Sequence, residues 1–311
     1  MFAPDGSLAR GHILFAAILL FVELLAAACS NVGSVEPTVA ASAPASGEES
    51  VSSDPGEATV GVAVGETTGS SGVPFVAKPE MSGGSSYKAD TILAVRYGAH
   101  QGYERVVIDL GTGDEPAETV PEWTLMSSAD DGLLRVTLPS MSGTGVSNGK
   151  LGDALLESFH VVRAPEGGMF VDFFARKTFV YRMLELSNPA RLVVDFKPSG
   201  EDLEAPLPAV GGNTVVVEPR AGARIEDPLT VCGYSRNFEA SNTIVLTDSD
   251  GEVVIRRAVL SNDWTSTWGY FETTVELPPF SGKGTLRVGA KSARDGSFEG
   301  VEIPVRGALK R

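Results

Sequence analysis

Short runs of alternating apolar and polar residues, separated by turn residues, recur between residues 87 and 306. The runs RVVIDL (Arg105–Leu110) and YFETTVEL (Tyr270–Leu277) are clear examples. A period of two places every second side chain on one face of a β-strand, whereas an amphipathic helix repeats every 3.6 residues. The pattern predicts an all-β chain with two consecutive β-sandwich-like modules.

The first module is expected at residues 87–200. RVVIDL places Val106, Ile108 and Leu110 on one face and Arg105 and Asp109 on the other. The later run RLVVDF repeats this pattern, with Arg191 and Asp195 on the outward face. We interpret these four charges as structural pairs on an exposed sheet face, because charges on such a face usually pair across strands.

Two other segments of this module break the alternation. GMFVDFFARK (Gly168–Lys177) is apolar on both faces, which indicates a strand in the middle of a core. Gly152–Phe159 is the one segment whose pattern is compatible with a short helix.

Motifs at the two ends of this module resemble a known family. VRYGAHQGYERVVIDL (Val95–Leu110) resembles the opening of the AMIN-like domains of exported bacterial proteins, where a basic residue and glycine precede a G-[FY]-[DE]-R-[VI]-V strand. LSNPARLVVDF (Leu186–Phe196) is similar to their closing strand, P-x-R-[LFY]-V-[VI]-D. The resemblance implies a two-sheet β module that targets proteins to the envelope by binding peptidoglycan.

The second module is expected at residues 214–306, where the alternation is cleaner. NTIVLTDSDGEVVIRRAVL (Asn242–Leu260) indicates two strands joined by DSDG, because glycine accepts a positive φ at the tip of a hairpin. Several short strands in this length predict an immunoglobulin-like sandwich, although the Cys…Trp…Cys framework of true immunoglobulin domains is absent.

This module resembles the immunoglobulin-like domain of bacterial spore germination. The motifs of that domain are a proline in the first strand, then P-[LV]-x-[VL]-x-G, F-E-[AG] and a D-x-[DN]-G turn. They occur here in order at Pro219, Pro228–Gly233, Phe238–Ala240 and Asp248–Gly251. Domains of this family appear on exported and lipid-anchored bacterial proteins, so the resemblance implies export.

The N-terminal segment leads to a cysteine that follows three alanines. Ile13–Val22 is an apolar run of ten residues, which is shorter than a membrane span of about 20 residues and suits a secretory signal. Ala26-Ala27-Ala28-Cys29 resembles a bacterial lipobox, although Leu, Val or Ile normally stands at the position of Ala26. The resemblance implies a signal peptide at 1–28 and a diacylglycerol on the thiol of Cys29. Ordinary secretion and an uncleaved anchor stay open as alternatives.

The segment from the cysteine to residue 86 is expected to be a disordered, acidic linker. Residues 29–86 are rich in Ser, Gly, Ala, Pro and Glu and have few aromatic residues. Such a segment buries too little apolar surface to offset its ordering entropy. Val60–Val64 is its only strand-like piece. Residues 201–213 are expected to link the two modules, and residues 307–311 to form a tail.

The formal net charge of the chain is −15, and it lies mainly in the linker and the first module. The sequence contains no stripe of basic residues that could bind the phosphate backbone of a nucleic acid, so nucleic acid is not an expected partner. The expected partners are the membrane, through the lipid, and peptidoglycan or another envelope protein at the extracytoplasmic face. We expect neither a cofactor nor a metal ion, because two cysteines and three histidines form no ligand-spaced cluster.

Several short motifs suggest chemistry, but each has a plainer structural interpretation. SNGK (Ser147–Lys150) matches Ser-x-x-Lys, but Asn-Gly is typical of a loop, and the partner motifs of penicillin-interacting enzymes are absent. DSDGE (Asp248–Glu252) starts like a calcium loop, but Val259 stands where the last carboxylate is needed, so a hairpin turn is expected. His100 and His160 lie near no nucleophile elbow and are expected at the surface or in packing.

The remaining aromatic and sulfur residues also favour structural roles. Trp264, Trp268 and Tyr270 are expected to pack in a core, with stacking on sugar rings as the alternative. Cys232 is expected to be a small buried residue without a disulfide. With no catalytic residues expected, the sequence predicts a non-enzymatic, lipid-anchored envelope protein that binds or scaffolds. The alternative is an accessory or sensing lipoprotein that regulates an envelope enzyme or a germination-like assembly.

Overall fold

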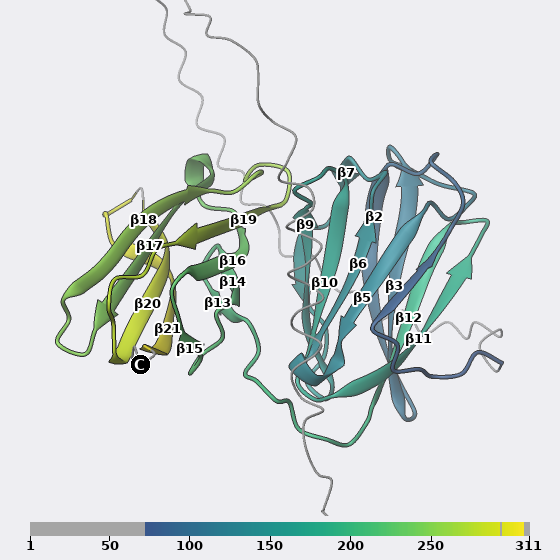
Figure 1. Cartoon of the computed structure of the whole chain (residues 1–311). Coiled ribbons are helices and arrows are strands. Elements are labelled where there is room, and N and C mark those ends of the chain that lie inside the picture. The colour runs from purple at the N-terminus through teal and green to yellow at the C-terminus, as the bar shows by residue number, and fades with distance from the viewer. Residues whose placement is uncertain (1–71, 293, 308–311) are drawn as a thin grey trace, which may run out of the picture. The chain divides into compact units, whose positions relative to one another are not determined.

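Strands make up most of the chain that the computed structural model describes, residues 72–292 and 294–307. All of these residues lie within one compact unit. They form two β-sandwiches in succession, which confirms the predicted fold class (Figure 1). The predicted signal peptide, Cys29 and most of the predicted linker lie outside the described residues. Among the described residues, no helix is long and apolar enough to cross a bilayer.

The first sandwich encloses one core between two sheets. One sheet has the strand order β11-β12-β3-β2-β7 with β4 beside β3, and the other contains β1-β5-β6-β10-β9 with β8 beside β9. Apolar residues predicted to face inward do so, and Ile108 and Val194 are fully buried. The strands are β1 (Glu80–Gly83), β2 (Thr91–His100), β3 (Tyr103–Thr112), β4 (Glu115–Pro116), β5 (Trp123–Ser128), β6 (Leu133–Leu138), β7 (Gly143–Thr144), β8 (Asn148–Lys150), β9 (Leu156–Arg163), β10 (Met169–Ala175), β11 (Phe179–Leu186) and β12 (Arg191–Pro198), with the short 3-10 turn η1 (Ala129–Asp131) after β5.

The second sandwich packs the sheet β15-β21-β20-β17-β18 against the strands β19-β16-β14-β13. The predicted hairpin is confirmed, since β17 and β18 are antiparallel neighbours and Gly251 has a φ of 85° at the turn. The elements are β13 (Ala209–Gly211), β14 (Thr214–Glu218), β15 (Arg224–Ile225), β16 (Leu229–Ser235), the 3-10 turn η2 (Phe238–Ala240), β17 (Ser241–Asp248), β18 (Val253–Leu260), β19 (Trp268–Val275), β20 (Gly282–Lys291) and β21 (Phe298–Gly307).

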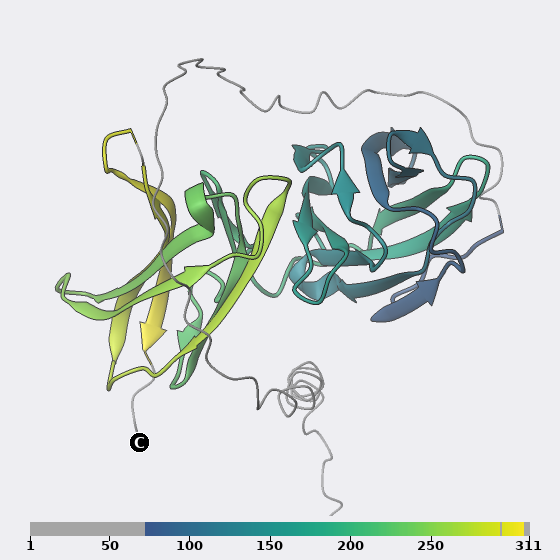
Figure 2. The same cartoon turned by 90° about the horizontal axis from the view of Figure 1, so that it is seen from above.

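The two sandwiches share a sheet. β19 pairs in parallel with β9, with Trp268 opposite Val162 and Gly269 opposite Arg163. β8 pairs with the earlier part of the same edge of β9. A ten-stranded sheet therefore runs through both modules, and the two layers of each sandwich are seen from above in Figure 2.

Both predicted linkers contain strands, so their boundaries were wrong. β1 lies before residue 86 and pairs with β5. The carboxylate of Glu185 fixes this region, because it accepts hydrogen bonds from Trp123 Nε1 and Gly84 N, each at 2.8 Å. Between the modules, residues 209–211 form β13 beside β14. Neither segment carries a sustained alternation, so its partner strand rather than its own pattern places it.

No helix forms at Gly152–Phe159, where the sequence pattern was compatible with one, because the segment leads into β9. The loop predicted at Ser147–Lys150 was wrong, since β8 occupies Asn148–Lys150. The carboxylate of Glu104 accepts hydrogen bonds from the backbone N–H groups of Leu155 and Leu156, at 3.0 and 2.8 Å. These two hydrogen bonds fix the start of β9. Most of the second segment forms β8 because the adjacent edge of β9 is open to it.

Candidate functional site

β10 is buried on both faces, as predicted, and each face meets a different module. Val171 and Phe173 point into the core of the first sandwich. Phe170 and Phe174 point the other way, against residues of the second module. We call this second cluster the junction cluster, and it consists of Val162, Ala164, Phe170, Phe174, Val215, Tyr234 and Trp268. The apolar second face of GMFVDFFARK is the sequence signal for it.

His160 of β9 lies among the aromatic rings of the junction cluster. Its ring centroid is 4.9 Å from that of Trp268, 5.4 Å from Tyr234 and 5.5 Å from Phe174. Burial lowers the pKa of His160 to about 3, so the imidazole is neutral near pH 7. Trp268 is likewise buried, as predicted, and its Nε1 donates to Asn148 Oδ1 at 3.2 Å. A neutral imidazole enclosed by rings serves packing rather than proton transfer.

A buried ion pair lies beside His160 on the same face of the sheet. Asp172 of β10 is the cross-strand neighbour of His160 on β9 and of Arg135 on β6. Arg135 donates through Nε and Nη2 to the two carboxylate oxygens of Asp172, at 2.7 and 2.8 Å. The guanidinium also lies 3.8 Å from the ring centroid of Phe170. Asp172 is fully buried, and the two hydrogen bonds from Arg135 offset the free-energy cost of removing its carboxylate from water.

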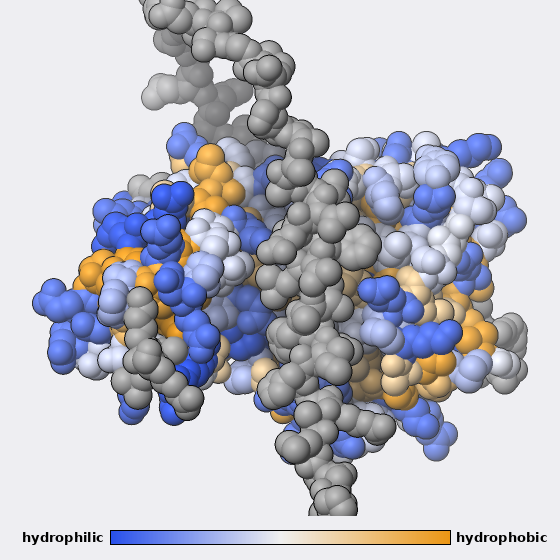
Figure 3. Space-filling model, viewed as in Figure 1, coloured by the Kyte–Doolittle hydropathy of each residue, from blue (hydrophilic) through white to orange (hydrophobic). Residues whose placement is uncertain are grey.

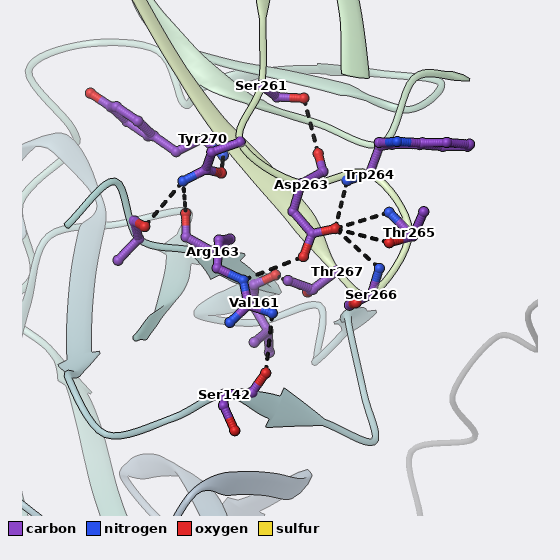
Figure 4. A network of polar contacts seen from close by, with 12 residues as sticks. Ser142, Val161, Arg163, Ser261, Asp263, Trp264, Thr265, Ser266, Thr267 and Tyr270 are labelled. Atoms are coloured by element: carbon purple, nitrogen blue, oxygen red, sulfur yellow. Dashed lines mark hydrogen bonds and ion pairs between the residues drawn. The ribbon is translucent and has the colours of Figure 1, made fainter. Parts of the chain in front are cut away.

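Polar contacts from the loop between β18 and β19 join the second module to β9 (Figure 4). Thr267 Oγ1 donates to the carbonyl of Val161 at 2.5 Å. Asn262 Nδ2 donates to the carbonyl of Arg163 at 3.2 Å. The guanidinium of Arg163 lies 3.3 Å from the carboxylate of Asp263. These contacts satisfy polar groups at the margin of the junction cluster.

Asp263 is positioned by its own loop before it meets Arg163. Its Oδ1 accepts hydrogen bonds from the N–H groups of Trp264, Thr265 and Ser266, at 2.7, 3.0 and 3.1 Å (Figure 4). Desolvation acts to raise the pKa of Asp263, but these hydrogen bonds and Arg163 outweigh it and lower the pKa below its usual value. The loop therefore presents an ionised carboxylate to the first module.

His160→Phe is expected to reduce the loss of stability in mild acid. The unfolded histidine has a pKa of about 6.5, whereas His160 in the folded chain titrates at about 3. Below pH 6.5 the unfolded state binds the proton preferentially, so the free energy of unfolding falls with pH, by about 2–3 kcal/mol at pH 4.5. Urea unfolding at pH 7 and 4.5 measures this difference. With His100→Phe as control, an unchanged pH dependence in His160→Phe would contradict the burial of a neutral imidazole.

The predicted charge pairing on β3 and β12 is present, but the expected exposure of Asp195 was wrong. Arg105 donates two hydrogen bonds to Asp195, at 2.6 and 2.9 Å, and Arg182 of β11 donates another at 2.6 Å. Asp195 is fully buried because these side chains lie over it. Asp109 instead pairs with Arg96 on the neighbouring strand.

The other residues singled out in the sequence are dispersed. Cys232 lies on β16, where burial raises the pKa of its thiol to about 12 and keeps it protonated. His100 stacks on a tyrosine ring of β3. Trp264 packs against the exposed Phe238, with centroids 5.1 Å apart, rather than in the junction cluster. Arg191 donates to a main-chain carbonyl at 3.3 Å.

A comparison with protein-family models matches residues 213–297 to the immunoglobulin-like domain of bacterial spore germination. The match contains strands β14 to β20 and confirms the resemblance of the second module. The AMIN-like resemblance of the first module and the lipobox at Cys29 stay predictions. Comparisons with curated proteins and with solved structures found no significant match.

Proposed function

We propose that this protein is a non-enzymatic, lipid-anchored envelope protein that binds or scaffolds through its two β modules. The observation that supports the proposal best is the junction, where ionisable side chains that could take part in catalysis are held in packing contacts. His160 is neutral among aromatic rings, and the Asp172 carboxylate is held by Arg135. The immunoglobulin-like domain matched by residues 213–297 is not a known catalytic family.

The junction also gives the two modules a reason to act together. A shared sheet and the junction cluster hold the two modules, and with them any loops or strand edges that bind a ligand, together as one body. A preorganised surface loses less conformational freedom on binding than two flexibly linked modules do. Peptidoglycan or another envelope protein would contact the loops and strand edges, while a lipid on Cys29 keeps the protein at the extracytoplasmic face.

A second candidate function is an accessory or sensing lipoprotein that regulates an envelope enzyme or a germination-like assembly. The observation in its favour is the description of the matched domain, which names spore germination. This function relies on contact with a protein rather than with the cell wall.

Binding to purified cell-wall sacculi separates the two candidates. We expect the full chain in non-ionic detergent to sediment with sacculi and to release no muropeptides. Co-purification with one envelope protein, without wall binding, would favour the accessory function. Release of muropeptides would overturn the non-enzymatic proposal.

The anchor is tested on the same cells by the intact mass of the protein in the membrane fraction. We expect a chain that begins at Cys29 and carries a diacylglycerol, and we expect Cys29→Ser to lose both the lipid and membrane retention. An unmodified mature chain would indicate ordinary secretion. A chain that keeps Met1 and stays in the membrane would indicate an uncleaved anchor.

A further inference from the structure

β18 presents a long open strand edge. It has eight residues and pairs with β17 on one side, and no other described strand pairs with its second side. Four of the other strands at the ends of the sheets are short: β1 has four residues, β13 three, and β7 and β15 two each. The fifth, β11, is partly covered, because Val76 forms a β-bridge with its residue Tyr181. An edge of this length is a template for another strand.

The side chains of β18 indicate which kind of strand fits. Val253 and Leu260, at its two ends, are 52% and 69% exposed. Figure 3 shows hydrophobic surface in the region where Figure 1 labels β17 and β18. Arg256 and Arg257, in the middle, are exposed, and neither forms an ion pair with another described residue. Two copies of β18 centred on each other would oppose these arginines, which is unfavourable, so the edge favours an acidic partner with small apolar residues.

A segment of this chain outside the described residues has this character. Residues 29–71 contain no Lys or Arg and six acidic residues, which are Glu36, Glu48, Glu49, Asp54, Glu57 and Glu66. Within them TVGVAVG (Thr59–Gly65) alternates valine with glycine or alanine and contains no proline. Such an alternation suits an extended segment that adds to a sheet edge by main-chain hydrogen bonds.

We propose that residues 59–65 of one copy add as a strand to β18 of a second copy. Val64 is twelve residues from Val76, which is bonded to the outermost strand of a sheet in the first module. Fully extended, this stretch reaches about 40 Å. In Figure 1, β18 and the strand β11, to which Val76 is hydrogen-bonded, lie on opposite sides of the two sandwiches. The segment of a neighbouring copy is therefore less constrained in reaching β18 than the segment of the same chain. Glu57 and Glu66, which flank the segment, are opposite in charge to Arg256 and Arg257 of β18. This favours the contact once the strands are within about 10 Å of each other, the Debye length at 0.1 M salt.

Cross-linking of two differently tagged full chains in non-ionic detergent tests this proposal. All variants carry Cys29→Ser, one copy carries Val62→Cys, and the other carries Ala258→Cys on the exposed part of β18. We expect mild oxidation to give a mixed disulfide dimer in about tenfold excess over the matched control Val39→Cys, because pairing raises the local thiol concentration. Val39 lies in the same linker but outside the valine run.

Charge variants test the specificity of this contact. Arg256→Glu together with Arg257→Glu is expected to lower the yield roughly fivefold, since like charges then face each other. Glu57→Lys with Glu66→Lys in the partner should restore it, and Lys283→Glu on β20 should leave it unchanged. A yield equal to that of Val39→Cys would overturn the proposal. So would a chain with both cysteines that forms only an internal disulfide, because that outcome assigns the segment to its own β18.

Discussion

Trp268→Ala is expected to separate the unfolding of the two modules. Trp268 packs against His160 and Tyr234, and its Nε1 binds Asn148 of the first module. Removing a buried tryptophan costs about 3–5 kcal/mol through lost contacts and the cavity left behind. The contacts with His160 and Asn148 join the two modules, so the substitution mainly weakens the free energy of interaction between the modules. Differential scanning calorimetry should show one transition for the native chain and two for the variant.

Trp264→Ala is the matched control for this change. Trp264 lies four residues earlier and packs on the exposed Phe238, outside the junction cluster. We expect it to cost about 1 kcal/mol, as is usual away from a packed core, and to keep one transition. If Trp268→Ala also unfolds in one transition at an unchanged temperature, the junction does not couple the modules.

Asp195→Ala is expected to destabilise the first module by about 3–5 kcal/mol. Its carboxylate is fully buried and receives hydrogen bonds from Arg105 and Arg182, whose side chains are only 11% and 10% exposed. The variant leaves both guanidinium groups in a partly dehydrated site without this counter-charge. Urea unfolding followed by circular dichroism measures the change in the free energy of unfolding.

The matched control is Asp109→Ala on the adjacent strand. Asp109 also forms a bidentate pair, with Arg96, but the two side chains are 21% and 37% exposed. Water screens this pair, so its loss should cost about 1 kcal/mol or less. Equal effects of the two substitutions would contradict the view that burial sets the importance of these ion pairs.

The same pair of residues shows how far sequence patterns reach. Alternation in RVVIDL and RLVVDF correctly placed Arg105 and Asp195 on one face and indicated that such charges pair, but not which residue pairs with which. It did not indicate that Asp195 is buried, because Arg182 comes from β11 and the cover depends on three strands meeting. Similarly, Glu80–Gly83 has no strong strand pattern and becomes β1 only by pairing with β5.

The described part of the candidate site was predictable only in fragments. The sequence singled out Trp268 and the strand at Gly168–Lys177 for a core, and His160 for the surface or for packing. In the structure all three are buried in packed positions. The sequence contained no indication that these residues meet. His160 and Trp268 are more than one hundred positions apart, and their contact depends on the parallel pairing of β9 with β19.

The sequence by itself determined the β class, the inward residues of most strands and the hairpin at Asp248–Gly251. These follow from local physics, since side chains alternate along a strand and glycine permits the turn. Only the tertiary structure decided what covers the second face of β10. A period of two shows which residues share a face, but not which sheet packs against it. Here the second module covers Phe170 and Phe174, and two sandwiches become one unit.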